Sequence, residues 1–227
     1  MSAGRPARWW HGTTAAVAAF GLGAQLTLEW VGAAALGTEL PPPRSERLLH
    51  FFSYFTVLSN VLVLVTSATL LRRPSRDGRV WRVVRASALT GITVTGVVHW
   101  FFLRPLVQLS GWASVTDRIL HLAVPALAVV GWLLFGPRPR VTGRVVLGSL
   151  ALPLVWLAYT LAVGAVSGWY PYPFVDVDQL GAAKVALSCL GLTATLGTVS
   201  ALLWWGDRRL PPTRVESDAR TGALENA

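Results

Sequence analysis

The stretch His50-Phe-Phe-Ser53-Tyr-Phe-Thr56-Val-Leu-Ser59-Asn60 opens an apolar run that lasts to Leu71. The run is long enough to cross a membrane as one helix, yet it carries histidine, serine, threonine and asparagine. Polar groups are costly in hydrocarbon unless they face a partner or a cavity, so they are functional candidates by default. On a continuous helix Ser53, Thr56 and Asn60 share one face. We therefore expect a buried polar site along that face.

The composition of the whole chain is typical of a membrane protein. Of its 227 residues, 53% are hydrophobic and only 14% are charged, which is too apolar for an ordinary soluble domain. The 11 Trp and 8 Phe fit interfacial aromatics. The net charge of +9 would suit nucleic acid, but the arginines cluster in short segments between apolar runs, as topology signals do. We expect membrane lipids as partners and no nucleic acid.

Six stretches provide the ~20 apolar residues that a helix needs to cross the hydrocarbon. They cover residues 13–36, 50–71, 84–103, 117–135, 143–166 and 181–205. The sequence therefore predicts an all-α polytopic membrane protein, a six-transmembrane-helix bundle formed by residues 1–205. Residues 206–227 are polar, include two prolines and show no apolar periodicity, so we predict a disordered tail.

The basic residues predict the orientation of this bundle. Fifteen of the 20 Lys and Arg lie in the N-terminal segment, the loops after the second and fourth spans, and the tail. The other five lie on the opposite side. Cytoplasmic loops are enriched in Lys and Arg, so we expect both termini in the cytoplasm of a multi-pass protein of the cell membrane. Only Lys184 is lysine, a bias that fits a GC-rich bacterial genome.

Polar residues of several spans then reach a common depth. Thr56, His99 and His121 lie ~6–9 Å below the outer face at the helical rise of 1.5 Å per residue. Glu29 lies in the outer half of the first span, one turn from Gln25. This agreement predicts one polar site near the outer leaflet. We expect its supporting residues to be His50, Ser53, Ser59, Asn60, His99 and Glu29.

Thr56, His121 and Asp117 have the residue types of a hydrolytic triad. A threonine hydroxyl needs a base to accept its proton, and histidine is the usual one. Asp117 lies one helical turn before His121, where it can hold one ring nitrogen and leave the other as the base. Simpler interpretations exist, since membrane threonines often bond the carbonyl one turn back and Asp117 could cap a helix. Pro125 is expected to kink the span beside His121.

The fifth and sixth spans are joined by Trp169-Tyr170-Pro-Tyr172-Pro-Phe174-Val-Asp176. Its two prolines exclude a regular helix, and its aromatic rings are expected at the outer interface, above the polar site. As a functional element, the segment with Tyr170, Tyr172, Phe174 and Asp176 is a lid or substrate-access loop. As a purely structural element, it is part of an aromatic belt with a stiff turn.

Three patterns together carry a resemblance to known proteins: Phe55-Thr56-x-x-Ser59-Asn60, Asp117-x-x-x-His121-x-x-x-Pro125 and Tyr170-Pro-Tyr-Pro-Phe174. With six spans, they resemble a bacterial group of six-span membrane proteins and, more distantly, the androgen-induced protein family of animals. The likeness covers about residues 13–205. The animal proteins are integral-membrane hydrolases of fatty acid esters of hydroxy fatty acids that use a threonine and a histidine. The resemblance implies that Thr56 and His121 are these two residues.

The favoured function is therefore an integral membrane lipid-ester hydrolase that needs no cofactor. Thr56 is expected to attack the ester, His121 to act as base and Asp117 to orient it. Asn60, Ser53, Ser59 or a histidine is expected to donate to the oxyanion.

Two other classes of function remain open. One is a zinc-dependent membrane hydrolase with His50, His99 and His121 as ligands, although no tight metal motif accompanies them. The other is a non-enzymatic membrane protein that binds haem between two facing histidines, or that binds lipid. The sole cysteine, Cys189, is interpreted as a small buried hydrophobe.

Overall fold

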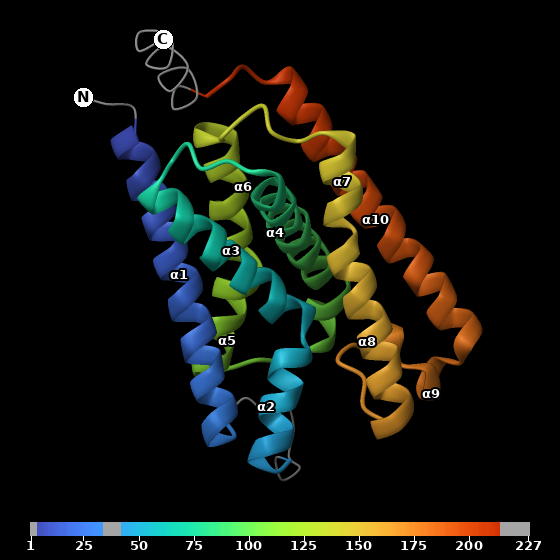
Figure 1. The fold of residues 1–227 in the computed structure, drawn as a ribbon. Coiled ribbons are helices and arrows are strands. Elements are labelled where there is room, and N and C mark those ends of the chain that lie inside the picture. The colour runs from blue at the N-terminus through green and yellow to red at the C-terminus, as the bar shows by residue number, and fades with distance from the viewer. Residues whose placement is uncertain (1–3, 34–41, 214–227) are drawn as a thin grey trace, which may run out of the picture.

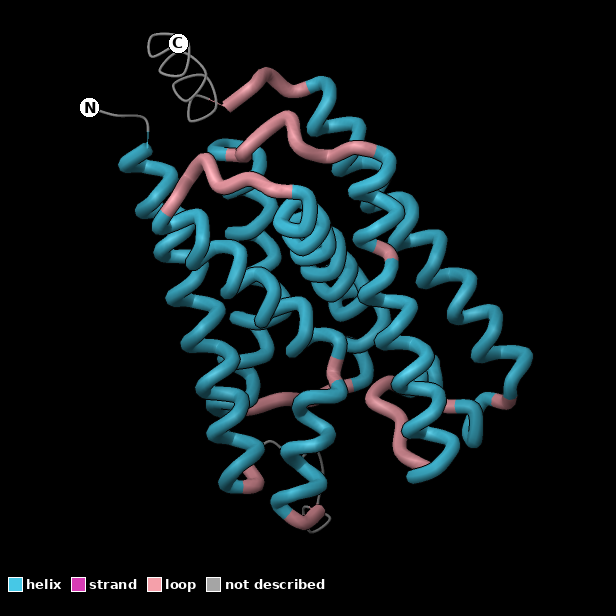
Figure 2. Tube along the Cα trace, viewed as in Figure 1, coloured by secondary structure: helices cyan, strands magenta, loops and turns pink. Residues whose placement is uncertain are grey.

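The computed structural model describes residues 4–33 and 42–213, and every regular element in these ranges is helical. The fold is therefore all-α, as the sequence predicts. The α-helices are α1 (Gly4–Val31), α2 (Arg44–Ser53), α3 (Phe55–Arg72), α4 (Arg79–Val98), α5 (Gly111–Arg118), α6 (Val124–Phe135), α7 (Gly143–Ser149), α8 (Ala151–Ser167), α9 (Val177–Leu180) and α10 (Ala182–Arg209). Successive long segments run in alternating directions (Figures 1 and 2).

Five segments are long and apolar enough to cross a membrane, as in a multi-pass membrane protein. They are Phe55–Arg72, Arg79–Leu106, Gly111–Phe135, Gly143–Ser167 and Ala182–Arg209. Helix α1 has 28 residues and lies side by side with α3 (Figure 1). Gln25 and Glu29 make it less apolar than the other five. The last residues of the first predicted span, 34–36, lie outside the described residues.

The second predicted span is not one continuous helix, and this part of the prediction was wrong. The chain turns extended at Tyr54 (φ −70°, ψ 129°), which separates α2 from α3. The break is held by tertiary contacts, because the indole N–H of Trp156 donates to the Ser53 carbonyl at 2.9 Å. Ser53 therefore ends α2, whereas Thr56 lies in the first turn of α3. The single polar face expected for these residues does not form.

Two segments contain a π-helical turn at a histidine. One covers His99–Leu103, at the end of α4, and the other Ile119–Ala123, between α5 and α6. A π turn inserts an extra residue into a helix and occurs often at functional sites. The second turn ends two residues before Pro125, where the sequence predicts a kink.

The apolar core lies where α1, α3, α4 and α6 meet. Its fully buried side chains include Ala18, Val63, Ile92 and Val124, one from each helix. Helix α8 lies outside this core and α10 contributes Leu203 to it. Both helices expose many apolar side chains, which is expected where helices face lipid. They pack against other elements but hardly against each other.

Residues 206–213, which the sequence assigns to the predicted disordered tail, belong to the described structure. Helix α10 continues to Arg209, and the buried Asp207 accepts hydrogen bonds from the backbone N–H groups of Arg140 and Val141 at 2.6 and 2.7 Å. These bonds tie residues 206–209 to the loop before α7. Residues 214–227 lie outside the described residues.

Candidate active site

Thr56, His121 and Asp117 are adjacent in space. Thr56 Oγ1 lies 3.2 Å from His121 Nε2, and His121 Nδ1 lies 3.0 Å from Asp117 Oδ1. The main-chain carbonyl oxygen of Asp117 also lies 3.0 Å from His121 Nδ1. When the Nδ1–H of the neutral imidazole donates to these Asp117 oxygens, Nε2 is left as the acceptor of the threonine proton. The three side chains therefore have the contacts of a nucleophile, a base and a group that orients the base.

His99 is a second partner of the Asp117 carboxylate. Its Nε2 lies 3.3 Å from Asp117 Oδ2, so the two carboxylate oxygens hold two different histidines. The two imidazole rings are stacked, with centroids 3.8 Å apart and planes inclined by 15°. This stacking leaves no space for a haem between these two rings. It also limits the rotation of His121.

The break at Tyr54 places a helix N-terminus at the site. Thr56 is the second residue of α3, and the first amides of a helix have no intrahelical acceptor. The N–H of Thr56 donates to the hydroxyl of Tyr172 at 3.3 Å instead. The partial positive charge of the helix N-terminus favours negative charge that develops here. A continuous helix through residues 50–71 would have used this amide internally.

Tyr172 is the member of the predicted lid loop that reaches Thr56. Its hydroxyl lies 3.3 Å from Thr56 Oγ1. The phenol is buried, and burial raises its pKa, so it remains a hydrogen-bond donor. Phe174 stacks on its ring with centroids 5.1 Å apart. Tyr172 therefore contacts both the backbone N–H and the hydroxyl of Thr56.

The rest of the predicted lid loop is anchored elsewhere. The ring of Tyr170 lies over Gly164 of α8, so close that a Cβ on the glycine would fall 2.0 Å from it. Asp176 is buried and caps α9, because its side chain accepts from the N–H of Gln179 at 2.9 Å. Asp176 thus has a structural contact that does not involve Thr56.

His50 lies apart from the other two histidines, so the predicted zinc ligand set is wrong. Its ring stacks on Trp169 with centroids 3.6 Å apart, and its Nε2 lies 3.7 Å from Glu46. The group that can surround an ion among the described residues is instead His99, Asp117 and His121, with ligand atoms within 4.8 Å of one another. The helix break separates His50 from the site, since it ends α2 before Thr56.

Two of the supporting residues are unsuited to the oxyanion role considered for them. Asn60 Nδ2 donates to the carbonyls of Thr56 (2.8 Å) and Leu120 (3.2 Å), which uses both of its protons. Ser53 Oγ donates to the Leu49 carbonyl and lies 2.9 Å from the Tyr159 hydroxyl.

Ser59 and Glu29 also contact residues other than Thr56 and the site histidines. Ser59 is buried where α3 meets α4, and a Cβ on Gly91 would fall 3.0 Å from its hydroxyl. Glu29 accepts from Gln25 at 3.1 Å rather than from a histidine. Gln25 in turn accepts from the Thr116 hydroxyl at 2.7 Å.

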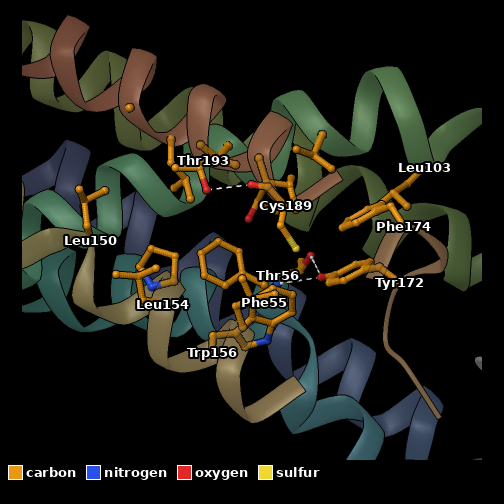
Figure 3. Close-up of a pocket in the computed structure, with 18 residues that line it drawn as sticks. Phe55, Thr56, Leu103, Leu150, Leu154, Trp156, Tyr172, Phe174, Cys189 and Thr193 are labelled. Atoms are coloured by element: carbon orange, nitrogen blue, oxygen red, sulfur yellow. Dashed lines mark hydrogen bonds between the residues drawn. The ribbon is translucent and has the colours of Figure 1, made fainter. Parts of the chain in front are cut away.

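Two cavities meet at Thr56. One has a volume of about 230 Å³ and lies between α4, α8 and α10, with Thr56 and Tyr172 at one end (Figure 3). The other has a volume of about 340 Å³ and contains His99, Asp117 and His121. Thr56, Tyr172 and Leu103 line both. The threonine is therefore accessible from an apolar space and from one that also contains ionisable side chains.

The chain matches no protein-family model, no curated protein and no solved structure. The arrangement of the site residues must therefore carry any functional conclusion. Sequence reasoning missed the contact of Tyr172 with Thr56 and the helix N-terminus at Tyr54. The position of Tyr172 between two prolines was a weak signal for its contact with Thr56. Nothing in the local sequence indicated that a helix begins after Tyr54.

Proposed function

We propose that the protein is an integral membrane ester hydrolase with Thr56 as its nucleophile. The single observation that carries this proposal is the continuous set of contacts from Thr56 Oγ1 through His121 to Asp117. An alcohol becomes a nucleophile when a base accepts its proton, and the base works best when a third group fixes its orientation. Thr56 supplies the alcohol, His121 the base, and Asp117 the group that fixes the orientation of the base.

Acylation begins when Thr56 Oγ1 attacks the ester carbonyl carbon and its proton passes to His121 Nε2. The tetrahedral oxyanion lies beside the start of α3, where the Thr56 N–H and the Tyr172 hydroxyl are suited to donate to it. When the bond to the alcohol oxygen breaks, that oxygen takes the proton from His121. The products are a free alcohol and an acyl ester of Thr56.

In deacylation, water is the nucleophile and Thr56 Oγ1 is the leaving group. Water attacks the acyl carbon of the Thr56 ester while His121 Nε2 accepts one of its protons. The bond from the carbon to Thr56 Oγ1 then breaks, and His121 returns the proton to Oγ1. A carboxylic acid leaves and the enzyme is regenerated. Asp117 stabilises the imidazolium in both halves of the reaction.

The membrane setting favours a lipid ester as substrate. With α1 as a sixth span beside the five apolar segments, and with the basic loops in the cytoplasm, Thr56 lies near the outer leaflet of the cell membrane. An ester carbonyl of a lipid reaches this depth while its chains remain in hydrocarbon. The animal family that the sequence resembles also hydrolyses lipid esters.

Active-site labelling tests the proposal directly. The purified protein in detergent is treated with a fluorophosphonate probe, alongside Thr56→Ala, His121→Ala and the control Thr198→Ala on the exposed face of α10. We expect labelling of the wild type and of the control, and none of the two site variants. Absence of labelling in folded wild-type protein would overturn the threonine mechanism.

A metal centre is the second candidate, because His99, Asp117 and His121 can converge on one ion. Three protein ligands with an open position are typical of catalytic zinc, which activates water at neutral pH. This alternative predicts stoichiometric zinc in the purified protein and ester hydrolysis that a chelator removes and zinc restores. It also predicts that Thr56→Ala retains most of the activity, whereas the threonine mechanism predicts its loss.

A further inference from the structure

The two cavities differ in chemistry as well as in position. The cavity between α4, α8 and α10, here called the acyl cavity, is lined almost entirely by apolar side chains (Figure 3). Examples are Val94, Leu157 and Leu196, one from each helix. Helices α8 and α10 hardly contact each other, because the cavity separates them. Both helices also expose apolar side chains on their outer surfaces. A hydrocarbon chain fits these surroundings.

The second cavity, here called the alcohol cavity, has both apolar and polar side chains in its lining. Its described lining includes the acidic side chains Glu29 and Asp117, the amide of Gln25, and the two stacked histidines, with no lysine or arginine. The basic groups beside these two acidic side chains are already engaged, because Arg47 donates to the main-chain carbonyls of Glu29 and Trp30 and both histidines contact the Asp117 carboxylate. A further carboxylate placed here would add a like charge, which is disfavoured. Hydroxyl groups, in contrast, find both hydrogen-bond donors and acceptors.

We propose that the two cavities divide the substrate at its ester bond, and that the substrate is a neutral lipid ester whose alcohol half is an uncharged polyol of the glycerol type. This inference rests on the proposed function. The acyl chain occupies the acyl cavity, the carbonyl carbon lies at Thr56, and the alcohol leaves through the alcohol cavity. Esters whose alcohol half carries a carboxylate are excluded, in contrast to the substrates that the family resemblance implies.

A matched pair of glycines on α10 tests the acyl cavity. Gly197 lines this cavity and Gly191 does not, yet an added Cβ at either position meets no atom within 4 Å. We expect Gly197→Phe to lower kcat/KM for oleoyl esters about tenfold or more while sparing acetyl esters. Gly191→Phe should change neither. Equal losses on long and short acyl chains, or no loss at Gly197, would overturn the assignment.

Cys189 gives a measurement that does not require turnover. It is the sole cysteine and lines the acyl cavity (Figure 3). In Thr56→Ala, the rate of Cys189 alkylation by a maleimide is measured without ligand, with 1-oleoylglycerol, and with the oleoyl ester of 3-hydroxypropanoate. The two ligands share the acyl chain and differ in the charge of the alcohol half. We expect severalfold protection by the glycerol ester alone.

The outcomes separate this inference from the proposed function. Equal protection by both esters would overturn the preference for a neutral alcohol, and no protection by either would overturn the acyl cavity. Protection by the glycerol ester, combined with no hydrolysis by the wild type, would support the two-cavity assignment and overturn the threonine mechanism. Glu29→Gln supplies a further check, since removing one acidic charge from the alcohol cavity should strengthen protection by the anionic ester relative to protection by the glycerol ester.

Discussion

Thr56 Oγ1 and His121 Nε2 lie 3.2 Å apart although 65 residues separate them in the chain. Two local departures from regular α-helix position this pair. The extended residue Tyr54 makes Thr56 part of a helix start, and the π turn at Ile119–Ala123 carries His121. The site is thus located where two membrane segments deviate from regular geometry, as functional residues often are.

The contact between Asp117 and His121 predicts the effect of Asp117→Asn. The amide can occupy the same space, but it carries no negative charge to stabilise the imidazolium. We expect kcat for ester hydrolysis to fall by about 10²–10⁴ with a small change in KM. Asp178→Asn, on the exposed surface of α9, is the control and should retain wild-type rates. A loss below about threefold for Asp117→Asn would argue against a triad.

The hydroxyl of Tyr172 is expected to act on the oxyanion. Tyr172→Phe keeps the ring and its stacking on Phe174 but removes the group that lies 3.3 Å from Thr56 Oγ1. We expect kcat to fall by about 10²-fold, with KM nearly unchanged, because loss of one such donor affects mainly the transition state. Tyr170→Phe provides the comparison within the same loop. Equal effects of the two substitutions would indicate a role in loop structure only.

The sequence was sufficient to predict the all-α class, because apolar runs of about 20 residues leave few alternatives. It also selected Thr56, His121 and Asp117, since intramembrane polar residues at one depth need partners. Their contact could not be predicted, because spacing along one helix does not determine which helices are neighbours.

Other features depend on contacts between distant segments. No glycine or proline marks the break at Tyr54, which is stabilised by Trp156, about 100 residues away in the chain. The same break moves His50 out of the site and onto Trp169. Local sequence patterns therefore gave the wrong zinc ligand set. The role of Asn60 as a bridge between two carbonyls likewise requires knowledge of where Leu120 lies.

The close approach of Tyr170 to α8 predicts that Gly164→Ala destabilises the loop. The new methyl group would lie 2.0 Å from the Tyr170 ring, so the ring must move. We expect a lower apparent Tm in detergent, by roughly 2–4 °C for each kcal/mol lost, and faster proteolysis within residues 168–176. Gly191→Ala has open space at its Cβ and is the matched control. Unchanged proteolysis in Gly164→Ala would contradict this placement of Tyr170.

Asp77 joins two loops at the end of the bundle remote from Thr56. Its carboxylate accepts two hydrogen bonds from Arg82, at 2.6 and 2.7 Å, and lies 2.7 Å from Nη1 of Arg140. The hydrogen bonds from Arg82 hold the pKa of Asp77 well below its usual range, with a further contribution from Arg140. Both loops therefore depend on the ionised carboxylate.

The direction of that pKa shift determines how Asp77 affects stability at different pH values. Because the folded-state pKa is lowered, the stabilisation is present above the unfolded-state pKa of about 3.9 and is lost as the pH falls toward the folded-state value. The side chain is 39% exposed, so solvent screening limits the effect to about 1 kcal/mol or less. We expect Asp77→Asn to lower the apparent Tm at pH 7, and the difference from wild type to shrink at pH 3. The control Asp178→Asn should have the same apparent Tm as the wild type at both pH values. A Tm difference between wild type and Asp77→Asn that stayed constant from pH 7 to pH 3 would rule out the ionic contribution.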